Sequence, residues 1–212
     1  MILLIGGEKG GAGKSTLACN MAAYLSIRKK DVLLVDADPQ KSSSIWASRR
    51  NDLDTVPKIQ CVEKTGNIAD VINDFKKRYD FVIVDTGGRD SKELRSGLIV
   101  ANKFYTPIKP SQIDIDTLAK MNELVEYASS INTHLSPYSI ITQAPTNPHM
   151  NDKDETSKIL SVIPNIHTSN VVIKYRSSYW RSMGQGLSVL EYSDDTKSMT
   201  EITNLGYEIF NI

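Results

Sequence analysis

The start of the chain carries the feature that most restricts its fold, an apolar run followed at once by a glycine-rich loop. The run is Ile2 to Ile5, and the loop, EKGGAGKST, spans residues 8 to 16. Gly10, Gly11 and Gly13 allow backbone amides to turn inward around an anion. A helix that begins after such a loop adds the partial positive charge of its N-terminus. The order of strand, loop and helix therefore predicts a phosphate-binding loop in an α/β protein.

Two lysines lie in this loop, and only one of them is needed to bind a phosphate. Lys14 can reach the β and γ phosphates of a nucleotide, and the Ser15 hydroxyl can hold Mg²⁺. The usual pattern G-x-x-x-x-G-K-[ST] has a glycine where this chain has Glu8. Lys9 is not required for the phosphate cradle, so it is either a solvated loop residue or a cation with another task.

Similar apolar runs recur along the chain and alternate with segments of helical spacing. Four further runs are Val32 to Val35, Phe81 to Val84, Phe104 to Ile108 and Tyr138 to Ile141. Runs without polar alternation are typical of strands that are covered on both faces. Helical spacing appears within Leu17 to Leu25 and Leu118 to Ala128. The sequence therefore predicts an α/β fold with a mostly parallel central sheet and helices on both faces, in one domain covering residues 1–212.

Acidic residues follow two of these runs, at the strand ends where parallel sheets bind ligands. Asp85 closes the run FVIV and can accept a hydrogen bond from a magnesium-bound water. Asp36 and Asp38 follow VLLV one residue apart, so both leave the same strand end. Turn formation ahead of Pro39 accounts for either aspartate alone. Two carboxylates beside a phosphate loop favour the positioning of a metal ion and of water.

Charge, cysteine content and hydropathy exclude several other classes of protein. The 25 Lys and Arg residues balance 25 Asp and Glu residues, so any binding of nucleic acid or anionic lipid requires a local patch. Cys19 and Cys61 lack metal-ligand spacing, which favours two reduced thiols. No stretch approaches the ~18 apolar residues of a membrane span, and no basic segment precedes the first run. We expect a soluble, cytoplasmic protein.

Three motifs together resemble those of the deviant Walker A ATPases, the ParA and MinD superfamily, and most closely the small plasmid-partition ParA proteins. They are KGGAGKST, VLLVDADPQ and FVIVDTGG. Weaker likenesses extend through most of the chain, in IITQAP at 140–145 and YRSSYWRSMGQGLSVLEY at 175–192. The resemblance implies a P-loop NTPase fold and a Mg²⁺-dependent hydrolysis of ATP to ADP and phosphate that is slow unless a partner stimulates it.

The resemblance also implies roles for individual residues. Lys9 matches the signature lysine of the superfamily, which crosses the interface of an ATP-dependent homodimer to the phosphates of the other subunit. The implied catalytic residues are Lys9, Lys14 and Asp38, the last of which positions the attacking water. The implied nucleotide-binding residues are Lys9, Gly10, Gly11, Ala12, Gly13, Lys14, Ser15, Thr16 and Gln143. The implied metal site consists of Ser15, Asp36 and Asp85. The implied switch is Thr86, Gly87 and Gly88, where many relatives have prolines and this chain has more backbone freedom.

The densest basic and aromatic cluster outside the loop consists of Lys174, Tyr175, Arg176, Tyr179, Trp180 and Arg181. One interpretation is an amphipathic helix with core aromatic residues and solvated cations. In the other, the cations contact DNA phosphates irrespective of base sequence. The resemblance favours non-specific DNA binding through Lys174, Arg176 and Arg181, and hence association with the nucleoid.

The last segment of the chain bears on membrane binding. Ile202, Leu205, Ile209 and Phe210 form an apolar stripe at helical spacing. Glu201 and Glu208 would oppose binding to anionic lipid, whereas a membrane-surface helix carries Lys or Arg on its polar face. The segment is therefore predicted to be a packed terminal helix without a role at a membrane.

The leading hypothesis is a switch ATPase that dimerises with ATP, coats nucleoid DNA and segregates a plasmid. A centromere-binding, ParB-like adaptor would stimulate hydrolysis and so release the ATPase from the DNA. One alternative is a ParA-like ATPase that positions a cargo other than DNA. Another is a metabolic phosphotransferase or ligase built on the same loop, against which Lys9 argues.

Overall fold

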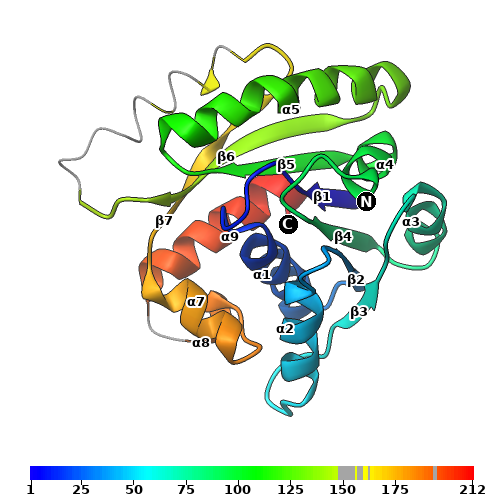
Figure 1. The fold of residues 1–212 in the computed structure, drawn as a ribbon. Coiled ribbons are helices and arrows are strands. Elements are labelled where there is room, and N and C mark those ends of the chain that lie inside the picture. Colours follow the sequence, from blue (N-terminus) through cyan, green and yellow to red (C-terminus); the bar gives the residue numbers. More distant parts are fainter. Residues whose placement is uncertain (148–155, 157–159, 162, 193–194) are drawn as a thin grey trace.

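A computed structural model of the protein describes residues 1–147, 156, 160–161, 163–192 and 195–212 (Figure 1). Its strands are β1 Ile2–Ile5, β2 Val32–Ala37, β3 Gln60–Glu63, β4 Phe81–Thr86, β5 Lys103–Ile108, β6 Ser136–Ala144 and β7 His167–Lys174. Its helices are α1 Lys14–Ile27, α2 Ser42–Asn51, α3 Ala69–Lys76, α4 Lys92–Val100, α5 Gln112–Ile131, α7 Ser177–Gly184, α8 Val189–Tyr192 and α9 Thr196–Phe210. The alternation of strand and helix follows the sequence prediction.

The strands in the described part of the chain form one sheet, in the order β3-β2-β4-β1-β5-β6-β7, and every neighbouring pair is parallel. β4 lies between β1 and β2. Asp85 on β4 is therefore in register with Ile5 on β1 and with Asp36 on β2. This topology brings the loop after β1 and the two acidic strand ends to one edge of the sheet, where ligands of parallel sheets bind.

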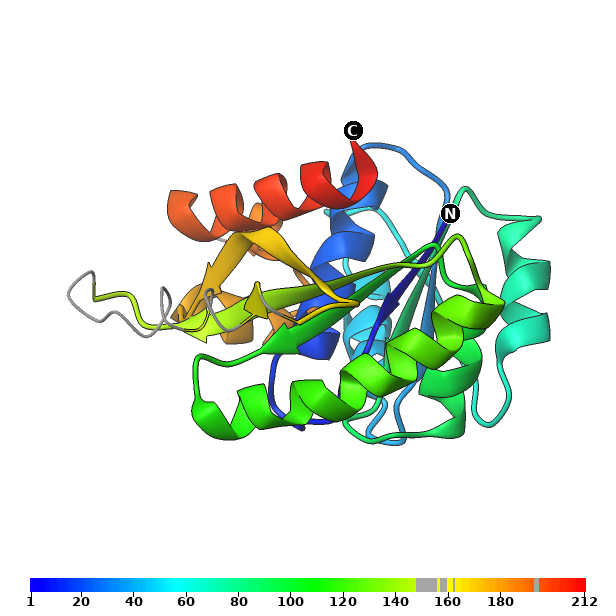
Figure 2. The ribbon, with the colours of Figure 1, turned by 90° about the horizontal axis from the view of Figure 1, so that it is seen from above.

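Helices cover both faces of the sheet, as predicted. Figure 2 shows α9 on one side of the sheet and α5 on the other. The core is divided accordingly: α1, α2 and α9 pack on one face, and α3, α4 and α5 pack on the opposite face. Along β1, Leu3 and Ile5 belong to the first cluster, and Ile2 and Leu4 belong to the second. Because both faces of β1 are buried, its sequence is apolar throughout.

The two outer strands, β3 and β7, were not predicted from the sequence. The five predicted runs correspond to β1, β2, β4, β5 and β6, and the two segments of helical spacing correspond to α1 and α5. In β3 the end residues Gln60 and Glu63 are exposed, and in β7 so are His167 and Asn170. Edge strands meet solvent on part of their surface, so their sequences mix polar and apolar residues and lack the apolar runs of the central strands.

The C-terminal helix α9 packs on the sheet, which confirms the prediction of a packed terminal helix. Its apolar stripe is buried at Ile202, Leu205, Ile209 and Phe210. Glu208 is half-buried and accepts hydrogen bonds from the hydroxyls of Tyr105 at 3.0 Å and Ser169 at 2.6 Å, so its carboxylate is engaged by the protein. Among the described residues, no helix combines the length and apolarity that a membrane span needs.

Candidate functional site

The loop between β1 and α1 is shaped by its glycines and by the end of β6. Gly11 has a φ of 70° and Gly13 a φ of 92°, in the left-handed region that favours glycine. The Thr142 hydroxyl donates a hydrogen bond to the carbonyl oxygen of Ala12 at 2.8 Å, and the Gln143 side-chain amide donates one to that of Gly11 at 2.6 Å. With these carbonyls held outward by β6, the loop is preformed around an anion site.

Lys14, the first residue of α1, is buried beneath this loop. Its ammonium donates a hydrogen bond to the carbonyl oxygen of Lys9 at 2.6 Å. Burial lowers the pKa of Lys14, while the charges of Asp85 and Asp38 act in the opposite direction. Lys14 is therefore held in place by the loop itself, beside two carboxylates that favour its charged form.

Asp85 lies completely buried at the end of β4. Burial raises the pKa of its carboxyl to about 7, and the hydroxyls of Ser15 and Ser43 oppose that rise. Ser43, on α2, donates a hydrogen bond to Oδ2 of Asp85 at 2.7 Å. The other oxygen, Oδ1, has no hydrogen-bond partner among the described residues. A buried carboxylate oxygen without a partner is costly unless a cation or water meets it.

These contacts fit a magnesium site made by Asp85 and Ser15. Carboxylate and hydroxyl oxygens suit Mg²⁺, which keeps several waters and binds phosphate oxygens with few protein ligands. Within the described residues, no group of three or more His, Cys, Asp or Glu side chains could hold a metal ion. A site that depends on nucleotide phosphates for its remaining ligands agrees with that finding.

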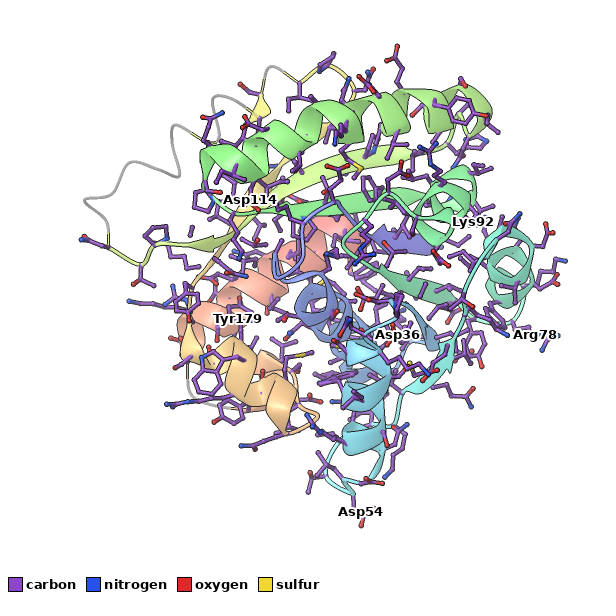
Figure 3. All side chains as sticks on the ribbon, in the orientation of Figure 1. Asp36, Asp54, Arg78, Lys92, Asp114 and Tyr179 are labelled. Atoms are coloured by element: carbon purple, nitrogen blue, oxygen red, sulfur yellow. The ribbon has the colours of Figure 1, made fainter. Side chains whose placement is uncertain are left out.

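Asp36 and Asp38 behave differently, although they leave the same strand end. Both oxygens of Asp36 are engaged with main-chain donors: Oδ1 with the amide of Asp38 at 3.1 Å, and Oδ2 with the amide of Ser44 at 2.7 Å. Figure 3 marks Asp36 near the start of α2. In this structure Asp36 therefore fixes the turn and the first residues of α2, and its role as a metal ligand stays a prediction. Asp38 is only half-buried, and one of its oxygens accepts from the amide of Gln40 at 2.9 Å.

Two cavities meet at the start of α1. The larger, of about 970 Å³, is lined by the phosphate loop, by Asp38, and by the predicted switch residues Gly87 and Gly88. It continues to Arg49 on α2 and Trp180 on α7. The smaller, of about 330 Å³, is bordered by the end of β6 and the residues that follow β7. Gly13, Thr16 and Trp180 line both cavities, so the loop lies between them.

The structure separates the three cations that were predicted to bind DNA. Arg176 forms an ion pair with Glu201 of α9 at 2.8 Å, in which the two side chains are only 16% and 13% exposed. Lys174 and Arg176 line the smaller cavity. Arg181 alone of the three is exposed, with its guanidinium 5.1 Å from the ring centre of Trp180. The three cations therefore do not share one solvated face, because the folding of α9 brings Glu201 to Arg176, and their role in DNA binding stays a prediction.

The aromatic residues of that cluster divide in the same way. Tyr179, marked on α7 in Figure 3, is buried, and its hydroxyl donates a hydrogen bond to Glu201 at 2.9 Å. Tyr175 is 64% and Trp180 is 59% exposed. Tyr179 is thus a core residue, while Trp180 and Arg181 form the exposed part of α7.

Comparison with known proteins identifies the class to which this site belongs. Residues 3–189 match the family described as the CobQ/CobB/MinD/ParA nucleotide binding domain, so the chain belongs to this family. The resemblance to the ParA and MinD superfamily is confirmed. The chain is therefore a ParA/MinD-type ATPase, and the loop after β1 is the candidate for its nucleotide-binding loop.

Individual relatives and solved structures extend this result. The "Maintenance of carboxysome distribution protein A" of Halothiobacillus neapolitanus is 27% identical over 209 residues, which are 95% of this chain and 92% of that protein. The MinC:MinD cell division protein complex of Aquifex aeolicus matches with a TM-score of 0.80 and 16% identity over 100% of this chain and 96% of that one. A putative plasmid partition protein of Borrelia burgdorferi, bound to AMPPNP, matches with a TM-score of 0.75 and 19% identity over 99% and 98%. The solved structures confirm the P-loop NTPase fold.

Proposed function

We propose that this chain is an ATP-dependent dimerising switch that hydrolyses ATP slowly until a partner protein stimulates it. The phosphates of ATP bind at the loop amides and Lys14, and Ser15 and Asp85 hold the accompanying Mg²⁺. When bound, Mg²⁺ neutralises charge on the β and γ phosphates and so assists hydrolysis. Asp38, which faces the larger cavity and is half-buried, orients the attacking water.

The observation that supports dimerisation is the state of Lys9. Within the described residues its ammonium has no hydrogen bond or ion pair, and only its carbonyl oxygen is engaged, by Lys14. Lys14 already supplies the cation that the loop's own phosphates need. A cation donated by a second subunit neutralises charge only when two nucleotide-loaded chains meet, as an arginine finger given in trans does. The same cation offsets the repulsion between two triphosphates brought face to face.

For the cargo, we propose plasmid or other DNA segregation, with non-specific DNA binding by the dimer on the nucleoid and release by a ParB-like adaptor. The likeness to a plasmid partition protein supports this assignment. The exposed Arg181 beside Trp180 offers a phosphate contact and a stacking surface on α7.

A second candidate is the positioning of a protein cargo, because the carboxysome-distribution relative aligns over 92% of its length. Both candidates use the same switch and differ in the adaptor. Co-sedimentation with DNA, measured with ATP, with ADP and without nucleotide, tests the DNA binding that the first candidate requires. A neighbouring gene for a small DNA-binding adaptor would favour DNA segregation.

The switch itself is tested by Lys9→Ala. This variant should bind ATP with unchanged affinity, because Lys14, Ser15 and the loop amides remain, yet stay monomeric by light scattering with ATP. Lys120→Ala is the matched control, because it also removes a positive charge near the loop and should still dimerise with ATP. The Lys120 ammonium lies 3.9 Å from the Glu8 carboxylate, and the lysine side chain is 74% exposed. Lys14→Ala should lose nucleotide binding altogether.

A Lys9→Ala variant that still dimerises normally with ATP would overturn the proposal. It would favour the phosphotransferase alternative, in which each chain works independently. A modest change in turnover with no change in oligomeric state is the result which that alternative predicts.

A further inference from the structure

We propose that Gly88 is a positioning residue for Lys9: the segment after β4 presses on the peptide group that joins Lys9 to Gly10 and fixes where the lysine side chain starts. This inference rests on the proposed function, in which Lys9 reaches the partner's phosphates. It adds a physical connection between the predicted switch and Lys9, the residue proposed to contact the second subunit.

The contact is between main-chain atoms on both sides. A Cβ on Gly88 would lie 2.7 Å from the amide nitrogen of Gly10, 2.8 Å from the carbonyl carbon of Lys9 and 3.0 Å from its oxygen. None of these atoms can rotate out of the way, unlike the end of a flexible side chain. Gly88 is not among the residues with a positive φ, so its backbone conformation suits alanine. A glycine is needed here for space.

The same peptide group is held from a second direction. The ammonium of Lys14 donates its hydrogen bond to the carbonyl oxygen of Lys9. The peptide group that follows Lys9 is therefore approached by two groups: Lys14 binds its carbonyl oxygen, and the switch segment lies against it at Gly88. A displacement of Gly88 towards the loop must move the Lys9–Gly10 peptide, break the bond from Lys14, or both.

The switch segment is short, and the residues on both sides of it make hydrogen bonds of their own. Before it, the Thr86 hydroxyl donates a hydrogen bond to the carbonyl oxygen of Ile5 at 3.2 Å. After it, Asp90 accepts two hydrogen bonds from Arg95, at 2.7 and 2.6 Å, and Ser91 caps α4. A change in this short stretch is therefore transmitted to its neighbours and is not absorbed by a long loop.

The other neighbour of the segment is Asp38. A Cβ on Gly87 would lie 3.4 Å from Oδ1 of Asp38 and 3.6 Å from Pro39, which is ordinary contact. The two neighbouring glycines therefore differ in what surrounds them: a methyl group at 87 fits beside Asp38, whereas one at 88 collides with the peptide group that joins Lys9 to Gly10.

The test compares Gly88→Ala with Gly87→Ala. Both variants add one methyl group and remove the same kind of backbone freedom, but only the methyl group at 88 collides with the loop. Gly88→Ala should bind ATP with nearly unchanged affinity in a titration, and its ATP-dependent dimer should weaken at least about tenfold, equivalent to about 1.4 kcal/mol. Gly87→Ala should dimerise like the wild type. Its hydrolysis rate is left out of the comparison, since its methyl group meets Asp38.

Thermal unfolding without nucleotide, measured on both variants, shows whether each is folded, and Lys9→Ala separates two kinds of failure. Loss of the dimer in Lys9→Ala together with a normal dimer in Gly88→Ala overturns this inference and leaves the proposed function standing. A normal dimer in Lys9→Ala overturns the proposed function and this inference with it. Loss of ATP binding in Gly88→Ala also overturns the inference, because Gly88 would then support the phosphate cradle and not Lys9.

Discussion

A buried ion pair joins α2 to α8. Arg50 on α2 is completely buried, and its guanidinium donates two hydrogen bonds to Glu191 of α8, at 2.8 and 2.7 Å. It donates further hydrogen bonds to the carbonyl oxygens of Pro57 at 2.9 Å and Gly186 at 3.4 Å. A cation with no exposed surface depends on these partners for its charge to be tolerated.

Glu191→Ala removes the anion and leaves the guanidinium with two carbonyl acceptors. Breaking one side of a buried pair costs about 3–5 kcal/mol of unfolding free energy, because a buried charge remains uncompensated. For a protein of this size, each kcal/mol lowers the midpoint of thermal unfolding by about 2–4 °C. We therefore expect a fall of about 6–20 °C. The double variant Arg50→Met/Glu191→Leu should lose much less, since no charge stays buried.

The assay is urea unfolding of the wild type and the single and double variants at pH 7. A loss below about 1 kcal/mol in Glu191→Ala, the range of an exposed pair, would refute this reasoning.

The dependence of stability on acid pH provides a second check. Burial raises the pKa of Glu191, but hydrogen bonds from Arg50 and Ser188 outweigh it, and the net pKa lies below 4.5. The contribution is therefore complete above pH 4.5 and is lost as the pH falls through the lowered pKa.

Two further predictions concern turnover and DNA. Asp38→Ala should keep ATP-dependent dimers but slow phosphate release by about 100-fold, because water is no longer oriented; normal turnover would move that role to Asp36. Arg181→Ala should weaken DNA co-sedimentation for all sequences. It should also reduce the slope of log binding constant against log salt concentration by about one, which corresponds to one phosphate contact. Arg176→Ala should instead lower the thermal midpoint, because Glu201 loses its cation. Equal DNA affinity of the wild type and Arg181→Ala across a salt titration would exclude α7 as the DNA surface.

Local features of the sequence were sufficient to predict the central part of the fold and the phosphate loop. Strands buried on both faces leave apolar runs, and a loop that binds phosphate needs glycines at fixed positions, so β1 and residues 8–16 carry their structure in adjacent residues. The same holds for Asp85, whose place at a strand end could be predicted before the order of the strands was known.

Contacts between distant residues could not be predicted in this way. Arg176 and Glu201 are 25 residues apart, and the sequence around Arg176 gives no sign that a carboxylate neutralises it. Thr142 holds the phosphate loop at Ala12, 130 residues away. The glycines at 87 and 88 were predicted to loosen the switch, but Gly88 has a specific spatial reason, its approach to the loop at Lys9. Each of these facts depends on how distant elements of the chain pack together, which no local pattern encodes.

The nucleotide site and the exposed part of α7 are connected through buried contacts of α2 and α1. The Trp46 indole donates a hydrogen bond to the carbonyl oxygen of Leu187 at 3.1 Å, and the Asn20 side chain accepts one from the amide of Val189 at 3.0 Å. A Cβ on Gly186 would lie only 2.4 Å from the amide nitrogen of Arg50, so the two backbones are in direct contact. α2 begins at the residues that hold Asp36 and Asp85. Any movement of α2 would therefore have to carry residues 186–191 with it or break these contacts, and α7 ends just before those residues.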